Sequence, residues 1–508
     1  MHRHGAGSRW NSDEYGYRGS AGSSAYGSGD EKRRRSGKTR ISRWQNAASR
    51  SRSAVVANHW HARLVNTTVV TTGGVTAARA VAAEICVDLR RGEFLDQSFE
   101  RRIVPLDARD RRWTRELVYG MLRHRAGIDA ILSGRVRGGL VRLDPDVIDL
   151  LRLGVYQLLY MGSVPAYAAI AQTVELAKRR HGIGASKLVN AVLRRTDRER
   201  EQLGTGQAPT DAIDALALKY SHPRWLIARW IERWGEQDTE RLLTLNNADA
   251  PIVIRPYGIV REQLEAMMEG AGVHVAEAPY ARDSIAISGG TTFTELGAFK
   301  KGLFFVQDPA ATLVTEYAAI PTGATAADLC AAPGGKALEL SRTAGTVVAS
   351  DKSFGRLQRL LGNQRRLESV NLYPFVGDAR NPAIRPVDAV LIDVPCTGTG
   401  TFRRHPDARW RIKVSDIAVM SALQKTILKA GATVVKPGGL MIYSTCSLEP
   451  EENDAQVDAF LSENLNWILE PPPEATVAPE LLDGGRLRVL PQRSGTDGAF
   501  AARLRRVS

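Results

Sequence analysis

The stretch Asp328-Leu329-Cys330-Ala331-Ala332-Pro333-Gly334-Gly335-Lys336 follows an alanine-rich run at 324–327 and precedes Ala337-Leu338-Glu339-Leu340. This order predicts a strand, a tight glycine turn and the start of a helix. In α/β folds, glycines at such a turn let backbone N–H groups and a helix N-terminus approach a cofactor closely. The sequence therefore predicts a cofactor-binding loop at 328–336.

Two common nucleotide motifs do not fit this loop. A P-loop requires a glycine five positions before the Gly of its Gly-Lys pair and a Ser or Thr after the Lys. Cys330 and Ala337 occupy those positions. The dinucleotide pattern G-x-G-x-x-G is absent as well, so we expect a cofactor without a diphosphate group.

Further strands recur at regular intervals after the glycine loop. Their segments are 346–351, 372–378, 389–393 and 440–445, and helical segments lie between them. This alternation predicts an α/β, Rossmann-like fold with a mostly parallel, doubly wound sheet. Such sheets bind ligands at the carboxyl ends of their strands.

Three acids end the first three of these strands. Asp351 lies 23 residues after Asp328, close to the separation at which an acid accepts hydrogen bonds from ribose hydroxyls. Asp378 and Asp393 end the next two strands, and Asp378 is expected near an adenine edge. Strand-end acids also cap helices, which is the alternative for any one of them. Three acids in register favour a nucleoside, and S-adenosylmethionine matches best when no diphosphate motif is present.

Two cysteines decide the chemistry, in Asp393-Val394-Pro395-Cys396 and Ser444-Thr445-Cys446-Ser447. Both follow a strand at the same predicted edge. Cytosine C5 is too weakly nucleophilic to take a methyl group directly, so a thiolate must first add at C6. A second group must then assist elimination. A single buried cysteine is more often a small hydrophobe, but the pair in these contexts predicts covalent catalysis.

Length and composition limit the class of protein. A chain of 508 residues suggests about three domains. A hydrophobic content of 43% without a long apolar run predicts no membrane span, and the basic N-terminus lacks a signal sequence. Cys86, Cys330, Cys396 and Cys446 lack the close pairing of a zinc site. We therefore expect a cytoplasmic protein with free thiols and no metal.

The positive charge is concentrated at the front of the chain. Residues 1–74 carry 13 Lys and Arg against 4 Asp and Glu, and residues 75–200 carry 23 against 15, whereas the remainder is slightly acidic. This asymmetry favours a nucleic-acid partner. Residues 1–74 are rich in Ser, Gly and Arg and poor in aliphatic residues, so we predict a disordered basic tail. The alternative for the tail is simple solvation.

The rest of the chain divides into three predicted domains. Helical periodicity across 75–200, with an almost wholly apolar segment at 147–161, predicts an all-α bundle. Residues 211–300 alternate helices and short strands, which predicts a small α/β module after a linker at 202–210. Residues 301–508 form the doubly wound α/β domain.

The bundle resembles the NusB-like RNA-binding domain through three motifs. They are Arg115-Glu116-Leu117-Val118-Tyr119-Gly120, Leu151-Arg152-Leu153-Gly154-Val155-Tyr156-Gln157-Leu158 and Val189-Asn190-Ala191-Val192-Leu193-Arg194. Each motif alone is also compatible with core packing. Together and in this order they indicate an RNA-binding domain.

The back half resembles the Sun/Fmu (RsmB-type) family of RNA (cytosine-C5) methyltransferases. The similar motifs are 305–311, 328–336, Asp351-Lys352, Asp378-Ala379, 393–400, 403–407, Thr445-Cys446-Ser447 with Glu451-Glu452-Asn453, and Asp497-Gly498-Ala499-Phe500. With the NusB-like front end, the resemblance is to the bacterial member that modifies 16S ribosomal RNA.

The resemblance implies a role for each candidate residue. Cys446 is the nucleophile, Cys396 assists product release and Asp393 meets N3 of the base. The implied S-adenosylmethionine contacts are Cys330, Ala331, Ala332, Pro333, Gly334, Gly335, Lys336, Asp351, Asp378 and Asp393. Asp393 is thus assigned to both cofactor and base.

Several alternatives stay open at this point. The same chemistry on tRNA is one, and an RNA-binding or antitermination factor with a relic catalytic domain is another. Arg403, Arg404, His405 and Trp410 are candidates for holding RNA phosphates and a splayed base, or form an ordinary loop. Glu451 and Glu452 either have a functional role in the motif that follows Thr445-Cys446-Ser447 or simply begin a helix.

Overall fold

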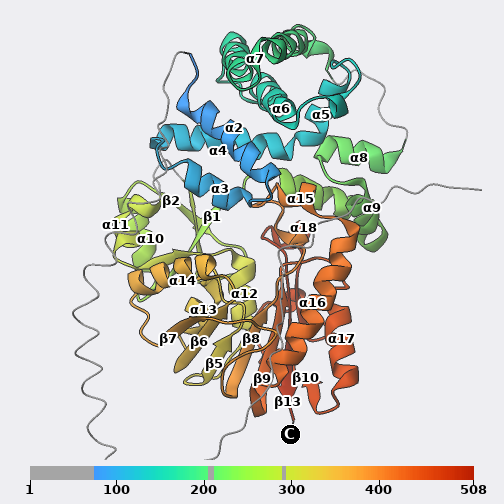
Figure 1. Ribbon diagram of the computed structural model, residues 1–508. Helices are drawn as coiled ribbons and strands as arrows, with labels where there is room; N and C mark the ends of the chain where they lie inside the picture. The colour runs from blue at the N-terminus through green and yellow to red at the C-terminus, as the bar shows by residue number, and fades with distance from the viewer. Residues whose placement is uncertain (1–73, 204–210, 289–292, 508) are drawn as a thin grey trace, which may run out of the picture. The chain divides into compact units, whose positions relative to one another are not determined.

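The computed structural model describes residues 74–203, 211–288 and 293–507, which form a helical part, a small sheet and a large sheet (Figure 1). The predicted disordered tail at 1–74 lies outside these residues, apart from Gly74. Within the described ranges, no helix is both long and apolar enough to cross a bilayer.

The helical part surrounds one central helix. Its α-helices are α2 (Ala77–Arg90), α3 (Leu95–Arg102), α4 (Ala108–Arg123), α5 (Arg125–Ser133), α6 (Pro145–Tyr160) and α7 (Ala166–Arg198). Asp144 caps the start of α6 by accepting a hydrogen bond from the Asp146 N–H at 2.8 Å. Most residues of α6 are buried, and it packs against α2, α4, α5 and α7. The all-α bundle is therefore confirmed, and the apolar segment at 147–161 lies at its centre.

The three NusB-like motifs pack against one another through glycines. A Cβ atom added to Gly120 of α4 would lie 1.8 Å from the hydroxyl of Tyr156 on α6. A Cβ atom on Gly154 of α6 would lie 2.7 Å from the side chain of Leu193 on α7. The motifs therefore have a packing role, because a larger residue at either glycine would displace the side chain of the facing helix.

The small sheet has four antiparallel strands in the order β2-β3-β1-β4. The elements of this part of the chain are α8 (Ala212–Tyr220), α9 (Arg224–Asn247), β1 (Ile252–Pro256), α10 (Arg261–Gly270), β2 (His274–Glu277), β3 (Ile285–Ser288), α11 (Gly297–Lys300) and β4 (Phe304–Val306). β2 was not predicted, because its residues are mostly exposed and lack an apolar pattern. β4 pairs with β1 although the sequence analysis places residues 301–508 in the next domain.

The large sheet has nine strands, five of them parallel neighbours in the order β9-β8-β5-β6-β7. The elements here are α12 (Pro309–Ala318), β5 (Thr325–Asp328), α13 (Gly335–Leu340), β6 (Thr346–Asp351), α14 (Phe354–Arg366), β7 (Leu372–Val376), β8 (Val387–Asp393), α15 (Ala408–Arg411), α16 (Val414–Ala432), β9 (Val435–Thr445), α17 (Asp454–Glu463), β10 (Trp467–Leu469), β11 (Leu482–Asp483), β12 (Arg486–Val489), α18 (Pro491–Ser494) and β13 (Ala499–Arg506). The predicted parallel α/β sheet is confirmed, and an antiparallel extension makes the whole sheet mixed.

The antiparallel extension was missed because its main strand carries arginines. β13 pairs with β9 along its length, yet its sequence contains Arg503, Arg505 and Arg506. Arg503 is buried, and its guanidinium donates to the Ala318 carbonyl at 2.9 Å and the Pro471 carbonyl at 2.8 Å. Hydrogen bonds to the backbone thus allow a charged residue inside this strand.

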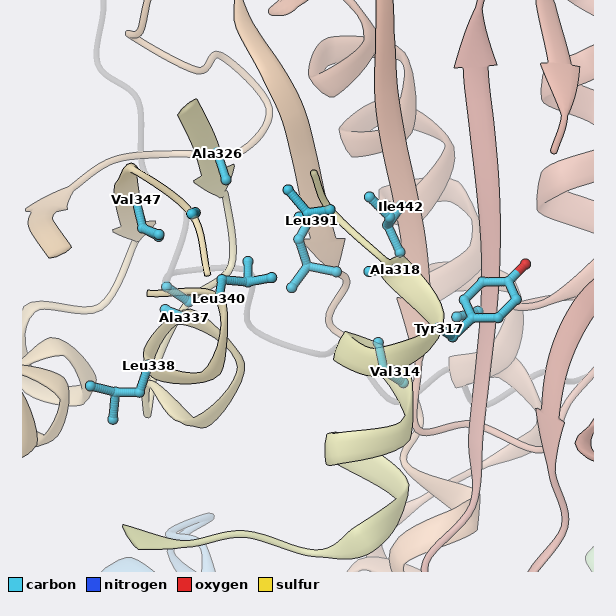
Figure 2. Packing of buried hydrophobic residues seen from close by; sticks show 14 of the residues in the cluster. Val314, Tyr317, Ala318, Ala326, Ala337, Leu338, Leu340, Val347, Leu391 and Ile442 are labelled. Atoms are coloured by element: carbon cyan, nitrogen blue, oxygen red, sulfur yellow. The ribbon is translucent and has the colours of Figure 1, made fainter. Parts of the chain in front are cut away.

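Two hydrophobic layers cover the faces of the parallel strands. Residues Ala326, Leu391 and Ile442 pack with α12 and α13 on one face (Figure 2). Their neighbours along the strands, such as Val390, pack on the opposite face with Ile427 of α16. This alternation follows from the period of two along a strand. It leaves the carboxyl ends of the strands as the place for polar residues.

Candidate active site

The glycine loop follows β5 as predicted. Gly334 has a φ of +118°, and a Cβ atom there would lie 2.4 Å from the Leu360 side chain, so the position requires glycine. Asp351, at the end of β6, accepts hydrogen bonds from the N–H groups of Ala332 at 3.2 Å and Ser353 at 2.8 Å. The second-strand acid therefore contacts the loop directly.

The other acids near the loop have distinct surroundings. Burial, with the charge of Asp393 as a second cause, raises the pKa of Asp328 to about 7. Burial likewise raises the pKa of Cys330. Asp378 lies two residues beyond β7, where hydrogen bonds from Arg380 lower its pKa to about 2. Asp378 is thus an ionised, partly exposed acid at the edge of the site.

The two cysteines predicted to be catalytic lie together just beyond the ends of β8 and β9. Asp393 and Ser444 pair across these parallel strands, and the Sγ atoms of Cys396 and Cys446 lie 3.2 Å apart. The hydrogen bond between the thiols, followed by burial, raises the pKa of Cys396. The same bond lowers the pKa of Cys446 against the effect of burial, and the charge of Lys336 adds to the lowering. Cys446 is therefore the thiol that ionises more readily.

Lys336 lies beside Asp393. The family resemblance predicts a cofactor contact for Lys336, and in the structure its Nζ contacts Asp393 Oδ2 at 2.7 Å. Ser444 Oγ donates to the other oxygen of Asp393 at 2.9 Å. Burial alone would lower the pKa of Lys336, but the charge and hydrogen bond of Asp393 outweigh it and leave the pKa raised. A permanent ammonium group therefore lies next to Asp393 and near Cys446.

Two buried acids follow Cys446: Glu449, which the sequence did not single out, and Glu452, which belongs to the Glu451-Glu452-Asn453 motif. Glu449 is fully buried and accepts hydrogen bonds from Arg229 at 3.0 Å and the Trp230 indole at 3.2 Å, both on α9. Glu452 is also fully buried and contacts Thr397, next to Cys396, at 2.9 Å through the backbone N–H. The signal for Glu452 was the Glu-Glu-Asn motif, which also fits a helix start; Glu449 lies outside that motif.

The loop after Cys396 contacts the helical part. His405 Nδ1 lies 3.0 Å from a carboxylate oxygen of Asp96 on α3, and Trp410 donates its indole N–H to the Leu122 carbonyl at 2.9 Å. Arg404 contacts Asp308 at 2.6 Å and Asp497 at 2.9 Å. These side chains, candidates for RNA contacts in the sequence, are engaged by other parts of the chain.

The His405–Asp96 pair gives a pH-dependent contribution to stability. Burial would lower the pKa of His405, but the hydrogen bond and charge of Asp96 raise it to about 9. Because the folded-state pKa lies above the unfolded value of about 6.5, the stabilisation is complete below that value and is lost as pH rises through 9. With 44% of the His405 side chain exposed, we expect about 0.5–1 kcal/mol.

The check is a double-mutant cycle of His405→Gln and Asp96→Asn, read as the free energy of unfolding at pH 6 and pH 10. The coupling energy should be positive at pH 6 and vanish at pH 10. An equal coupling energy at both pH values would contradict the charge-based account.

Three features define a Rossmann-like methyltransferase. They are the parallel sheet covered by helices, the glycine loop at its carboxyl edge and the acid at the end of the second strand. The comparisons with known proteins agree. Residues 319–505 match the family described as 16S rRNA methyltransferase RsmB/F, residues 76–198 match the NusB family, and residues 222–294 match the ferredoxin-like domain of RsmF/B-like methyltransferases. The chain belongs to the RsmB/F family of ribosomal RNA methyltransferases.

Individual relatives cover most of the chain. A probable ribosomal RNA small subunit methyltransferase B of Synechocystis is 35% identical over 447 residues, which span 85% of this chain and 99% of the relative. Ribosomal RNA small subunit methyltransferase B of Vibrio cholerae is 35% identical over 439 residues, 84% of this chain and 96% of the relative. The crystal structure of PH0851 is 27% identical with a TM-score of 0.72, covering 84% of this chain and 98% of that one.

The cofactor is S-adenosylmethionine, and the loop fits it. The Asp351 carboxylate lies against the loop and keeps acceptor capacity for the hydroxyls of a nucleoside beyond its bonds to Ala332 and Ser353. Gln307 adds a buried side-chain nitrogen that has no hydrogen-bond partner within the described residues. A Cβ atom on Gly335 would lie 3.0 Å from this nitrogen. Glycine at this position thus lets the loop lie close to an unsatisfied donor without crowding it.

Proposed function

We propose that the enzyme methylates C5 of a cytosine in 16S ribosomal RNA through a covalent bond between Cys446 and C6. The observation that supports this most strongly is the thiol pair, with sulfurs 3.2 Å apart and pKa values shifted in opposite directions. A binding protein with a relic catalytic domain needs neither thiol, so the intact pair argues against that alternative.

The proposed reaction assigns one step to each thiol. The Cys446 thiolate adds to C6, and the electron pair of the C5–C6 double bond makes C5 nucleophilic. Bound S-adenosylmethionine supplies an electrophilic methyl group. After methyl transfer the C5 proton passes to a base, the electron pair of the C5–H bond re-forms the double bond, and Cys446 leaves as a thiolate. Cys396 is proposed to be that base in its thiolate form, because its raised pKa makes the thiolate a strong proton acceptor.

Asp393 is proposed to meet N3 of the base, with Lys336 as its support. The Lys336 ammonium and the Ser444 hydroxyl hold the two oxygens of Asp393 at 2.7 Å and 2.9 Å. Charge that develops on the ring during addition would lie near this ammonium group, which favours the adduct electrostatically. The same charge helps to ionise Cys446.

The Asp351 carboxylate is proposed to bind the ribose of the cofactor. Asp351→Ala should weaken S-adenosylmethionine binding by about 10- to 100-fold, because each hydrogen bond to a charged acceptor contributes about 1.5–3 kcal/mol. Titration calorimetry measures this change. Asp458→Ala is the matched control, since Asp458 is an exposed acid paired with Arg486 outside the site. Unchanged affinity in Asp351→Ala would remove Asp351 from the cofactor site.

Small-subunit ribosomal RNA is the proposed substrate, either as naked RNA or in a pre-ribosomal particle. The proposed compartment is the cytoplasm. The names of the relatives support this choice over tRNA. Bisulfite sequencing of ribosomal and transfer RNA from a deletion strain tests it. We expect one 16S cytosine to lose protection, and the wild-type chain but not Cys446→Ala to restore it. Loss of protection in tRNA alone would support the alternative substrate.

A further inference from the structure

We propose that Glu452 is a positioning residue whose carboxylate ties the loop that carries Cys396 to the loop that carries Cys446 and so sets the separation of the two sulfurs. The importance of this separation rests on the proposed function. The tie itself is a structural statement that can be tested without RNA or cofactor.

Four donors from three segments converge on the Glu452 carboxylate. Oε1 accepts from the Thr397 N–H at 2.9 Å and from Gln424 Nε2 of α16 at 2.9 Å. Oε2 accepts from the hydroxyls of Thr397 and Ser447. Thr397 follows Cys396 and Ser447 follows Cys446, so one carboxylate holds the nearest neighbour of each thiol.

Both sides of Cys396 are fixed by this network. Gln424 donates to the Pro395 carbonyl at 3.0 Å as well as to Glu452. The two loops also touch directly, since the Gly400 N–H donates to the Cys446 carbonyl at 3.0 Å. A Cβ atom on Gly400 would lie only 2.7 Å from that carbonyl oxygen. The close approach of the loops therefore depends on a small residue and on the carboxylate tie.

Burial makes the position of Glu452 specific. The residue is fully buried, and the donors that contact its carboxylate are neutral groups within the described part of the chain. A buried carboxylate is stable only when it is well hydrogen-bonded, so any shift of either loop would leave it unsatisfied. Its charge also contributes to the raised pKa of Cys396, after the bond to Cys446 and burial.

The reactivity of Cys396 toward iodoacetamide tests the tie. The full chain is alkylated without RNA or S-adenosylmethionine, and the labelled cysteines are quantified by mass spectrometry. Glu452→Ala should label Cys396 about tenfold faster, the effect of losing one hydrogen bond to a charged group. Glu452→Gln should stay near the wild-type rate, because its amide oxygen still accepts and its nitrogen donates to the hydroxyls. Glu451→Ala, a neighbour paired with Arg229, is the matched control.

Two outcomes would overturn the proposal. The first is a Glu452→Ala variant whose Cys396 is alkylated at the wild-type rate. The second is a Glu452→Gln variant whose Cys396 is alkylated as fast as in Glu452→Ala, because the effect would then come from the charge alone. If Glu452→Ala does not fold by thermal melting, Thr397→Val takes its place, with a severalfold increase expected and an unchanged rate contradicting the tie. Failure of the covalent mechanism appears separately, as the absence of an RNA adduct in Cys396→Ala.

Discussion

Cys396→Ala should accumulate a covalent RNA–protein species that survives denaturing electrophoresis. Addition by Cys446 and methyl transfer proceed in this variant, but release is impaired because the assisting thiol is missing. The species should require both S-adenosylmethionine and the target cytosine. Methyl transfer should stop after about one turnover per enzyme, which a single-turnover assay with labelled cofactor measures against the electrophoretic band.

Cys446→Ala is the matched control and should be inactive without any adduct. A thiol of ordinary pKa is only about 3% ionised at pH 7, so the proposed nucleophile must be activated, and the lowered pKa of Cys446 supports that role. The double variant should behave like Cys446→Ala, since release is irrelevant when addition never occurs. An adduct in Cys446→Ala would reverse the two roles. Activity in both single variants without an adduct would contradict covalent catalysis.

Lys336→Met should lower kcat by about 100-fold or more at pH 7, the effect of removing one preorganised charged group from a reacting centre. The Lys336 charge lowers the pKa of Cys446, so its removal raises that pKa. The activity lost at pH 7 should therefore be partly regained as pH rises toward 9. The measurement is kcat as a function of pH.

The control for this variant is Lys425→Met, a surface lysine paired with Glu463 at 2.7 Å. It should keep the wild-type pH profile. Calorimetry with S-adenosylmethionine separates the two roles considered for Lys336. Weaker cofactor binding with an unchanged kcat would return Lys336 to the cofactor site and contradict its role beside Asp393.

The parallel sheet could be predicted from sequence because its strands are apolar and regularly spaced. Because the strand ends could be located in the sequence, the acids there could be predicted too, and Asp351 and Asp393 each end a strand. β2 and β13 were not visible. β2 is mostly exposed, and β13 places a buried arginine in a strand by satisfying it with backbone carbonyls. Tertiary hydrogen bonds of this kind leave no periodic signal.

The site was predictable only where a motif carries chemistry. The glycine loop, Cys396 and Cys446 come together as expected, because parallel strands bring their carboxyl ends to one edge. The family resemblance assigns Lys336 to the cofactor, and no local pattern reveals that its long side chain contacts Asp393. Glu452 fitted either the family motif or a helix start, and its burial depends on loops that no local pattern reveals.

The central claim is that Cys446 bonds to C6 of a cytosine, and one measurement tests it directly. The wild-type enzyme is incubated with S-adenosylmethionine and substrate RNA that carries 5-fluorocytidine, in which C5 has no proton to lose, so release is blocked. The adduct is digested with trypsin and the RNA-linked peptide is identified by mass spectrometry. Cys396 and Cys446 fall in different peptides, since Arg403 and Lys429 lie between them. We predict RNA on the Cys446 peptide; RNA on the Cys396 peptide, or no linked peptide, would contradict the account.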